Sequence, residues 1–422
     1  MFETSDFVQL GITPSGSAAC LSHADRRRHV YLIGKTGTGK STLLYNFMMS
    51  DLARGHGFAL LDPHGDLAEA VADSVPARRT NDVVYLDPSD LAFPVGLNPI
   101  AGVEPDRRPL VAAHIVAAFQ HIWGNSWGPR LEYILTNALR LLLDAPGSTL
   151  LGLPRLLSDE RYRNRLLAQS HDPVVRGFWT QEFAAYAERF QMEAIAPVQN
   201  KVGTLLSPPA IRNMLGQSRS GIDIRRVMDD GHILIVNLSK GRLGEAPAHL
   251  LGAFLATAFA QAAETRADVP EAERRDFTLY ADEFQNFATD SFAAILSEAR
   301  KYRLALILAH QFLGQLPPLL RQAVIGNAGS VIVFRVGAED APLLAAELGE
   351  PKPTAHTELA KITASTKNKQ NDQPNEEHHI QMLPAQSTVA ARLTAIRNRT
   401  RARHARPREA VENRIARFLA AH

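Results

Sequence analysis

Short runs of β-branched and aliphatic residues recur along the chain, and we predict that each forms a buried strand. Helix-like stretches follow several of these runs, and strands that alternate with helices indicate a parallel sheet covered by helices on both faces. The sequence therefore predicts an α/β fold. The runs are residues 29–33, 58–61, 83–86, 232–238, 277–281, 304–308 and 331–336.

Between about residues 104 and 220 this alternation stops. One face of a helix is marked by an apolar series, and similar patterns run through 110–122 and 180–196. We predict an all-helical inserted domain over 104–220, flanked by two parts of the core at 1–103 and 221–350. The series consists of Leu131, Ile134, Leu135, Ala138, Leu139 and Leu142.

The C-terminal part has an unusual composition. Residues 351–381 are polar and rich in Lys, Asn, Gln and Thr, so we predict a loop or a disordered linker there, within a polar linker over 351–390. Residues 391–422 carry nine arginines against two glutamates, while the whole chain has a net charge of only +2. A basic tail on a mildly acidic body indicates either an anionic partner, nucleic acid foremost, or a solvated end without a partner. A short terminal helix is expected around Val411 and Ile415.

Composition excludes several classes of protein. With 422 residues, 45% hydrophobic and 21% charged, the chain is neither disordered nor fibrous and is long enough for two or three domains. The one cysteine, Cys20, cannot form an internal disulfide or a zinc cluster. The apolar stretch from Leu250 to Ala263 suits a buried helix better than a membrane span of about 20 residues. We therefore expect a cytoplasmic protein with no membrane segment of its own.

The first predicted strand runs into a sequence that fits G-x-x-x-x-G-K-[ST] and then into an apolar helix. Glycines in this loop let backbone N–H groups converge on phosphate oxygens at a helix N-terminus. Lys40 is expected to reach the β- and γ-phosphates and Ser41 to bind Mg²⁺. The predicted nucleotide-binding residues are Gly34, Lys35, Thr36, Gly37, Thr38, Gly39, Lys40, Ser41 and Thr42.

Two further strands end in polar residues that such a loop requires. Residues 277–281 end in Asp282 and Glu283, and we expect Asp282 to hold Mg²⁺ and Glu283 to polarise an attacking water. The next strand ends in His310 and Gln311, which places Gln311 where an amide can contact the γ-phosphate or that water. ATP and Mg²⁺ are therefore the predicted ligands.

Other motifs leave alternatives open. Residues 62–66 (DPHGD) follow the second strand and line either the nucleotide site or a subunit contact, without a metal at His64. Arg300, just before the strand of Gln311, is either an arginine offered to the γ-phosphate of a neighbouring subunit or a basic residue that caps a helix end.

Seven blocks in order resemble the conjugative (type IV secretion) coupling-protein branch of the HerA/FtsK superfamily of ring-shaped DNA translocases, over about residues 8–350. The resemblance implies a RecA-like P-loop ATPase core with a helical insertion, a homohexamer around DNA, and Arg300 or Arg335 as the arginine that acts in trans. The blocks are RRRHVYLIGKTGTGKSTLL, LLDPHGDLAEA, VVYLDPSD with LNPI, SWGPRLE, MDDGHILIVNLSKGRLGE, LYADEFQNFATDSFAAILSEARKYRLALILAHQ and GNAGSVIVFRVGAEDA.

Three functions are compatible with these features. The first is an ATP-driven DNA translocase that works with a relaxase, a nuclease or a secretion-channel ATPase and reaches the inner membrane only through such a partner. The second is an ATPase that energises protein transfer in a type IV secretion-like system. The third is a nucleotide-gated scaffold that recruits a nuclease or relaxase. Glu283 and Gln311 argue against the scaffold, because a protein that only switches can lose its water-activating residues.

Overall fold

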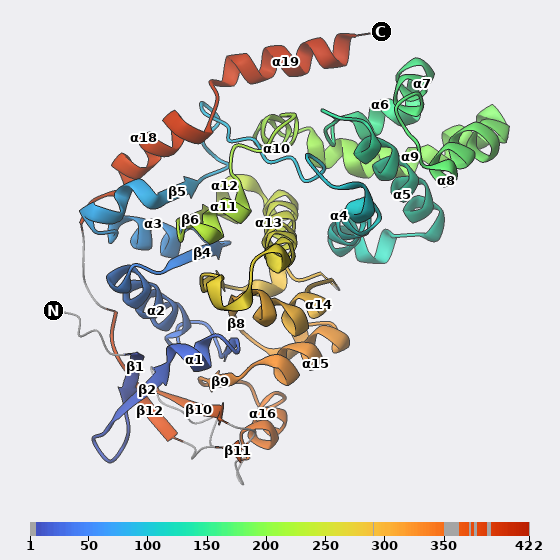
Figure 1. Ribbon diagram of the computed structural model, residues 1–422. Helices are drawn as coiled ribbons and strands as arrows, with labels where there is room; N and C mark the ends of the chain where they lie inside the picture. Colours follow the sequence, from blue (N-terminus) through green and yellow to red (C-terminus); the bar gives the residue numbers. More distant parts are fainter. Residues whose placement is uncertain are drawn as a thin grey trace. The chain divides into compact units, whose positions relative to one another are not determined.

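The computed structural model describes residues 6–289, 291–349, 363–370, 373–374, 378–385 and 390–421 (Figure 1). The chain folds into two compact units, which are described separately below. The first comprises Met1–Leu86, Ile224–Ser239 and Leu255–Arg399, and the second comprises Asp87–Asp223, Lys240–Phe254 and Thr400–His422.

The first unit contains a sheet with seven parallel strands in the order β9-β3-β8-β7-β4-β6-β5. All seven predicted strands are present, so the α/β prediction is confirmed. Their bounds are Val30–Ile33 (β3), Gly57–Asp62 (β4), Val83–Leu86 (β5), Ile233–Asn237 (β6), Phe277–Ala281 (β7), Leu304–His310 (β8) and Ser330–Val333 (β9).

These strands are buried on both faces, as their continuous apolar sequences require. Every residue of β3, β4, β5, β6, β8 and β9 is buried. The first unit includes α1 (His23–Arg26), α2 (Lys40–Arg54), α3 (Asp66–Asp73), η1 (Ala77–Asp82), α11 (Ile224–Asp229), η6 (Arg266–Asp268), η7 (Glu271–Glu273), η8 (Phe284–Asn286), α14 (Ser291–Glu298), η9 (Ala299–Tyr302), η10 (Leu313–Gln315), α15 (Pro318–Asn327) and α16 (Ala341–Leu348).

Four antiparallel strands extend the sheet beyond β9, in the order β2-β1-β12-β10 (Figure 1). They are Phe7–Ile12 (β1), Ala18–Ser22 (β2), Thr363–Gln370 (β10) and His378–Met382 (β12), and the short β11 (Gln373–Pro374) pairs with β10. Residues 351–381 include β10, β11 and most of β12, so the prediction of a loop or disordered linker is wrong for these strands. The remaining residues of 351–381 lie outside the described part of the chain. Ala364 of β10 and Ile380 of β12 are fully buried and hold the strands on the core.

Within residues 104–220, the second unit consists of helices joined by loops. Its helices bury the predicted apolar series, with Ile134, Ala138 and Leu142 fully inaccessible. The bounds are η2 (Pro105–Arg107), α4 (Arg108–Trp123), η3 (Gly124–Ser126), α5 (Pro129–Asp144), α6 (Gly152–Ser158), α7 (Glu160–Leu167), α8 (Pro173–Gly177), η4 (Phe178–Glu182), η5 (Phe183–Ala185), α9 (Glu188–Leu206), α10 (Pro209–Leu215) and α12 (Lys240–Leu243).

The arginine-rich end is also helical, in α18 (Leu393–His404) and α19 (Arg408–Ala420). The predicted terminal helix buries Val411 and Ile415, whereas Leu419 is 55% exposed. Among the described residues, Arg397, Arg401 and Arg408 pair with carboxylates of the chain itself. These pairs are Arg397 with Glu69 (3.6 Å), Arg401 with Asp90 (2.7 Å) and Arg408 with Glu412 (2.9 Å). Part of the basic charge is thus neutralised within the fold.

The apolar helix predicted around residue 250 is α13 (Glu245–Thr265), which passes from the second unit into the first. Residues Glu245–Asp268 are long and apolar enough to cross a membrane by length and composition, yet 67% of the most apolar window is buried within the fold. Such burial is typical of the core helix of a folded domain.

Candidate nucleotide site

The loop between β3 and α2 is tied to its neighbours by backbone hydrogen bonds. The Gly34 N–H donates to the His310 carbonyl at 3.3 Å, and the Lys35 N–H donates to the Arg335 carbonyl at 2.8 Å. Gly37 and Gly39 have φ of 75° and 116°, a left-handed region that glycine enters without strain. These two glycines explain how the chain turns tightly enough to present its amides at the first turn of α2.

Lys40 is buried at the start of α2. Its ammonium donates to the carbonyls of Gly34, at 2.5 Å, and Lys35, at 3.2 Å. Burial lowers the pKa of Lys40, and the nearby carboxylates of Glu283 and Asp282 oppose that shift. The ammonium is therefore held inside the loop by acceptors that phosphate oxygens can replace.

Ser41 and Asp282 meet beside the loop. The Ser41 hydroxyl donates to Asp282 Oδ2 at 3.1 Å, and the Asp282 N–H donates to the Leu61 carbonyl at 3.2 Å. Burial raises the pKa of Asp282 to about 6, and the negative charges of Asp62 and Glu283 add to the shift. Asp62, which ends β4 next to β7, is fully buried and accepts from the His64 and Ala68 N–H groups, each at 2.9 Å.

The buried carboxylates of Asp62 and Asp282 suit a divalent cation. Two buried carboxylates side by side are costly unless a cation neutralises them, and carboxylate and hydroxyl oxygens are the ligands that Mg²⁺ prefers. Of the alternatives for residues 62–66, the structure places Asp62 at the nucleotide site.

Glu283 follows Asp282 with φ of 46° and ψ of 50°, the left-handed region, which is rare outside glycine. Both oxygens of its carboxylate accept from amides: Oε1 from Gln311 Nε2 at 3.1 Å, and Oε2 from Gln285 Nε2 at 2.7 Å. Gln311 lies at the end of β8, as predicted. The structure thus brings Lys40, Ser41, Asp282, Glu283 and Gln311 together at the carboxyl ends of the parallel strands. That location is where α/β sheets bind ligands.

The two candidate arginines lie at opposite ends of the sheet. Arg300 is exposed on η9, which precedes β8, whereas Gln311 follows it. A seven-residue strand separates them by on the order of 20 Å, so Arg300 is remote from its own site. Arg335 is exposed beside its own loop, where its carbonyl accepts from Lys35.

Sequence reasoning missed several residues around the site. Gln285 was not identified, because no motif marks it. Asn237 ends β6, donates to the Tyr85 hydroxyl at 3.0 Å and lies so close to Gly65 that a Cβ there would be 2.6 Å from its Oδ1. A cavity of about 680 Å³ opens beside the loop and is lined by Lys35, Thr36, Gln311, Phe312, Gly337, Ala338, Glu339 and Asp340. Its last four residues follow β9 and belong to the block GNAGSVIVFRVGAEDA, but they were not among the predicted site residues.

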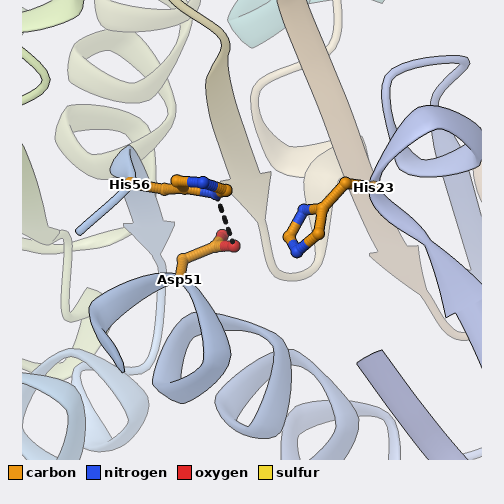
Figure 2. Close-up of side chains that lie close together, drawn as sticks. All are labelled: His23, Asp51 and His56. Atoms are coloured by element: carbon orange, nitrogen blue, oxygen red, sulfur yellow. Dashed lines mark ion pairs between the residues drawn. The ribbon is translucent and has the colours of Figure 1, made fainter. Parts of the chain in front are cut away.

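A second cluster, His23, Asp51 and His56, has the composition of a metal site (Figure 2). Arg26, however, already donates two hydrogen bonds of 2.9 Å to the Asp51 carboxylate, and Tyr280 donates a third at 2.5 Å. A buried guanidinium supplies the positive charge that a metal ion would otherwise bring. We interpret the cluster as a structural network that joins α2 to β7.

Comparisons with known proteins agree with this geometry. Residues 276–388 match the family model described as the TraM recognition site of TraD and TraG. The bacterial conjugative coupling protein TrwBΔN70, in its unbound form, superposes with a TM-score of 0.65 at 16% identity, covering 92% of this chain and 91% of that one. The resemblance to conjugative coupling proteins is confirmed.

Two other solved structures extend the comparison. The plasmid coupling protein TrwB in complex with ADP and Mg²⁺ gives a TM-score of 0.64 at 16% identity and covers 93% of each chain. VirB4 of Thermoanaerobacter pseudethanolicus gives 0.58 at 14% identity, over 91% of this chain and 98% of that one. No curated protein matches the chain in sequence. The first unit therefore has a RecA-like P-loop fold, as TrwB and VirB4 do.

Proposed function

We propose that this protein is an ATP-hydrolysing, ring-forming DNA translocase of the coupling type. The observation that carries the proposal is the convergence of Lys40, Ser41, Asp282, Glu283 and Gln311 on one edge of the sheet. It is supported by the similarity in fold to the plasmid coupling protein TrwB, whose structure is in complex with ADP and Mg²⁺.

Each residue has a distinct task in hydrolysis. The backbone amides of residues 34–41 and the Lys40 ammonium bind the phosphates and neutralise charge that builds up on them. Ser41 and Asp282 would hold Mg²⁺, which supplies charge neutralisation at the β- and γ-phosphates when bound. Glu283 accepts the proton of the attacking water, and Gln311 contacts the γ-phosphate or orients that water.

The ring is part of the proposal because an arginine from a neighbouring subunit would add to the charge neutralisation that Lys40 and Mg²⁺ supply in the transition state. Arg300 is too distant from its own site and exposed at the opposite edge of the sheet, where a neighbouring subunit can receive it. Arg335 lies beside its own loop and is therefore the weaker candidate for action in trans. We assign the trans role to Arg300 in a homohexamer.

DNA is the substrate favoured by the coupling-protein resemblance, with a relaxase or nuclease as partner. The region 276–388 is the one proposed to contact an accessory protein, since its family model is named for recognition of TraM. A second candidate is an ATPase that drives protein transfer, which would use the same hydrolysis site with a protein substrate.

Steady-state ATPase assays with single-stranded DNA, double-stranded DNA or no DNA test the proposal, with mass measured by light scattering in ATP. Stimulation by DNA that weakens steeply with salt is expected for a translocase. Lys40→Ala and Glu283→Gln should abolish it, whereas Glu298→Gln, an exposed carboxylate paired with Lys301, should not. Hydrolysis in a monomer that ignores DNA would contradict the translocase, and stimulation by a protein substrate alone would favour the second candidate.

A further inference from the structure

Gln285 lies on η8, in direct contact with the carboxylate of Glu283. Its orientation is fixed by chemistry, because an ionised carboxylate only accepts hydrogen bonds and the atom 2.7 Å from Glu283 Oε2 must be the amide nitrogen. Gln285 Oε1 therefore points away from Glu283.

That oxygen is buried and has no hydrogen-bond partner among the described residues. A buried acceptor without a partner in the protein is unfavourable for the fold. Fold stability alone does not favour such an arrangement, and unsatisfied groups of this kind point to a functional constraint. The hydrogen bond to Glu283 is the contact that this orientation secures.

The two amides on Glu283 differ in where they come from. Gln311 reaches Oε1 from the end of β8, whereas Gln285 reaches Oε2 from the turn that contains Glu283 itself. In the same turn, Asn286 Nδ2 donates to the Glu283 carbonyl at 2.6 Å and holds the left-handed backbone. Glu283 is thus anchored locally, independently of Gln311.

This division matters for hydrolysis. Gln311 cannot hold Glu283 and engage the γ-phosphate or its water with the same N–H group. When the Gln311 amide turns to the nucleotide, Glu283 Oε1 becomes free to face the water. Gln285 then still donates its hydrogen bond to Glu283 Oε2. We propose that Gln285 is a positioning residue that keeps the Glu283 carboxylate aimed at the attacking water. The inference rests on the ATPase activity proposed above.

Three substitutions at Gln285 test this role by charge and shape. Gln285→Met keeps the volume and removes both polar atoms, Gln285→Glu keeps the shape but places a second carboxylate against Glu283, and Gln285→Asn keeps the amide on a shorter side chain. Misplacement of a catalytic group by about 1 Å can cost on the order of a hundredfold. We expect kcat to fall about tenfold or more in Gln285→Met and further in Gln285→Glu, with a partial return in Gln285→Asn.

Nucleotide affinity and folding separate this role from a structural one. KM and the Kd of a fluorescent ATP analogue should be unchanged, because Gln285 holds the base and not the phosphates. The same substitutions at Gln181, exposed on η4, should leave kcat unaltered. If Gln285 had only a packing role, the kcat values of Gln285→Met and Gln285→Glu would differ only as far as the thermal unfolding midpoints of the two variants differ.

The outcomes distinguish this inference from the proposed function. If the wild-type chain hydrolyses ATP and Glu283→Gln abolishes hydrolysis, while Gln285→Met and Gln285→Glu match the wild type, the inference is overturned and the proposed function stands. Loss of kcat that follows loss of folded protein would overturn it as well. A wild-type chain without ATPase activity would overturn both.

Discussion

Ser41 Oγ donates a hydrogen bond of 3.1 Å to Asp282 Oδ2 and so joins the first turn of α2 to the end of β7. The two residues are 241 positions apart in the sequence. Parallel strands bring them together, because the loops that follow β3 and β7 leave the sheet at the same edge. The hydroxyl already points at the carboxylate beside which Mg²⁺ is expected to bind.

Loss of either oxygen should weaken Mg²⁺ binding. We predict that Ser41→Ala and Asp282→Asn raise the Mg²⁺ concentration for half-maximal ATPase activity about tenfold or more. Asp282→Asn should have the larger effect, since it removes a charge and not only a ligand. Magnesium titrations at saturating ATP measure this.

The matched control for that titration is Ser297→Ala, which removes an exposed hydroxyl that donates to the Ala294 carbonyl at 2.8 Å. It should leave the magnesium dependence unchanged. Equal dependence in Ser41→Ala and the wild type would show that the hydroxyl is not a magnesium ligand.

The buried pair of Arg26 and Asp51 yields a prediction about stability. Burial alone would raise the pKa of Asp51, but the Arg26 guanidinium beside it holds that pKa well below its usual range. Arg26→Met strands the carboxylate in the core, and breaking a buried pair in this way costs about 3–5 kcal/mol. Thermal or urea unfolding should show this loss, with much of it recovered in Arg26→Met combined with Asp51→Leu.

A metal ion at His23, Asp51 and His56 would give a different pattern. Zn²⁺ would then raise the unfolding midpoint of the wild type, and the double variant would lose that response. We expect no rise with Zn²⁺, because Arg26 already neutralises Asp51.

The sequence was sufficient for the parallel sheet and for the residues at its carboxyl edge. Strands such as β8 are continuous apolar runs, and a motif directly after a strand is carried to that edge by topology. The strands β10 and β12 could not be recognised, because their sequence is largely polar and the buried apolar residues among their described side chains, Ala364, Ile380 and Met382, are isolated. Strands of this kind are specified by their pairing partners on both sides and not by their own hydrophobicity.

Contacts between distant residues also escaped sequence reasoning. Arg26, Asp51 and Tyr280 lie on three separate elements, and no spacing along the chain relates them. Gln285 lies two residues from Glu283, but its contact depends on the left-handed backbone at Glu283, which sequence did not predict. Motifs therefore identified the reacting groups, whereas the residues that position those groups could be identified only from the fold.

His29 makes the stability of the fold dependent on pH. The Leu306 N–H donates to its Nδ1 at 3.0 Å, so Nδ1 is unprotonated and Nε2–H donates to the Leu296 carbonyl at 3.0 Å. Burial lowers the pKa of His29 to about 4, from 6.5; the hydrogen bond to Leu296 opposes this shift, and the positive charge of Arg300 adds to it. As the pH falls, His29 is protonated in the unfolded chain before it is protonated in the folded protein. The stabilisation is therefore complete above pH 6.5 and is lost between pH 6.5 and 4.

Between pH 6.5 and 4, protonation of His29 lowers the free energy of unfolding by about 3 kcal/mol. We predict that His29→Asn is less stable than the wild type near pH 7.5 but loses less stability on acidification. Asparagine tolerates the φ of 69° at this position, and its carbonyl can replace Nδ1 as the acceptor. Urea unfolding at several pH values measures the difference, and parallel curves for the two proteins would contradict the role of His29.

Arg300 gives the sharpest prediction about assembly, because its geometry forbids a role in its own site. Arg300→Ala and Lys40→Ala should each lack ATPase activity, the first for want of a cation from the neighbour and the second for want of its own phosphate-binding lysine. Mixing the two variants should restore a measurable fraction of the activity, since some interfaces then combine an intact Arg300 with an intact Lys40. Arg335→Ala mixed with Lys40→Ala is the comparison: restoration only in that mixture would transfer the trans role to Arg335. No restoration in either mixture, with rings still present by light scattering, would show that hydrolysis needs no arginine from a neighbouring subunit.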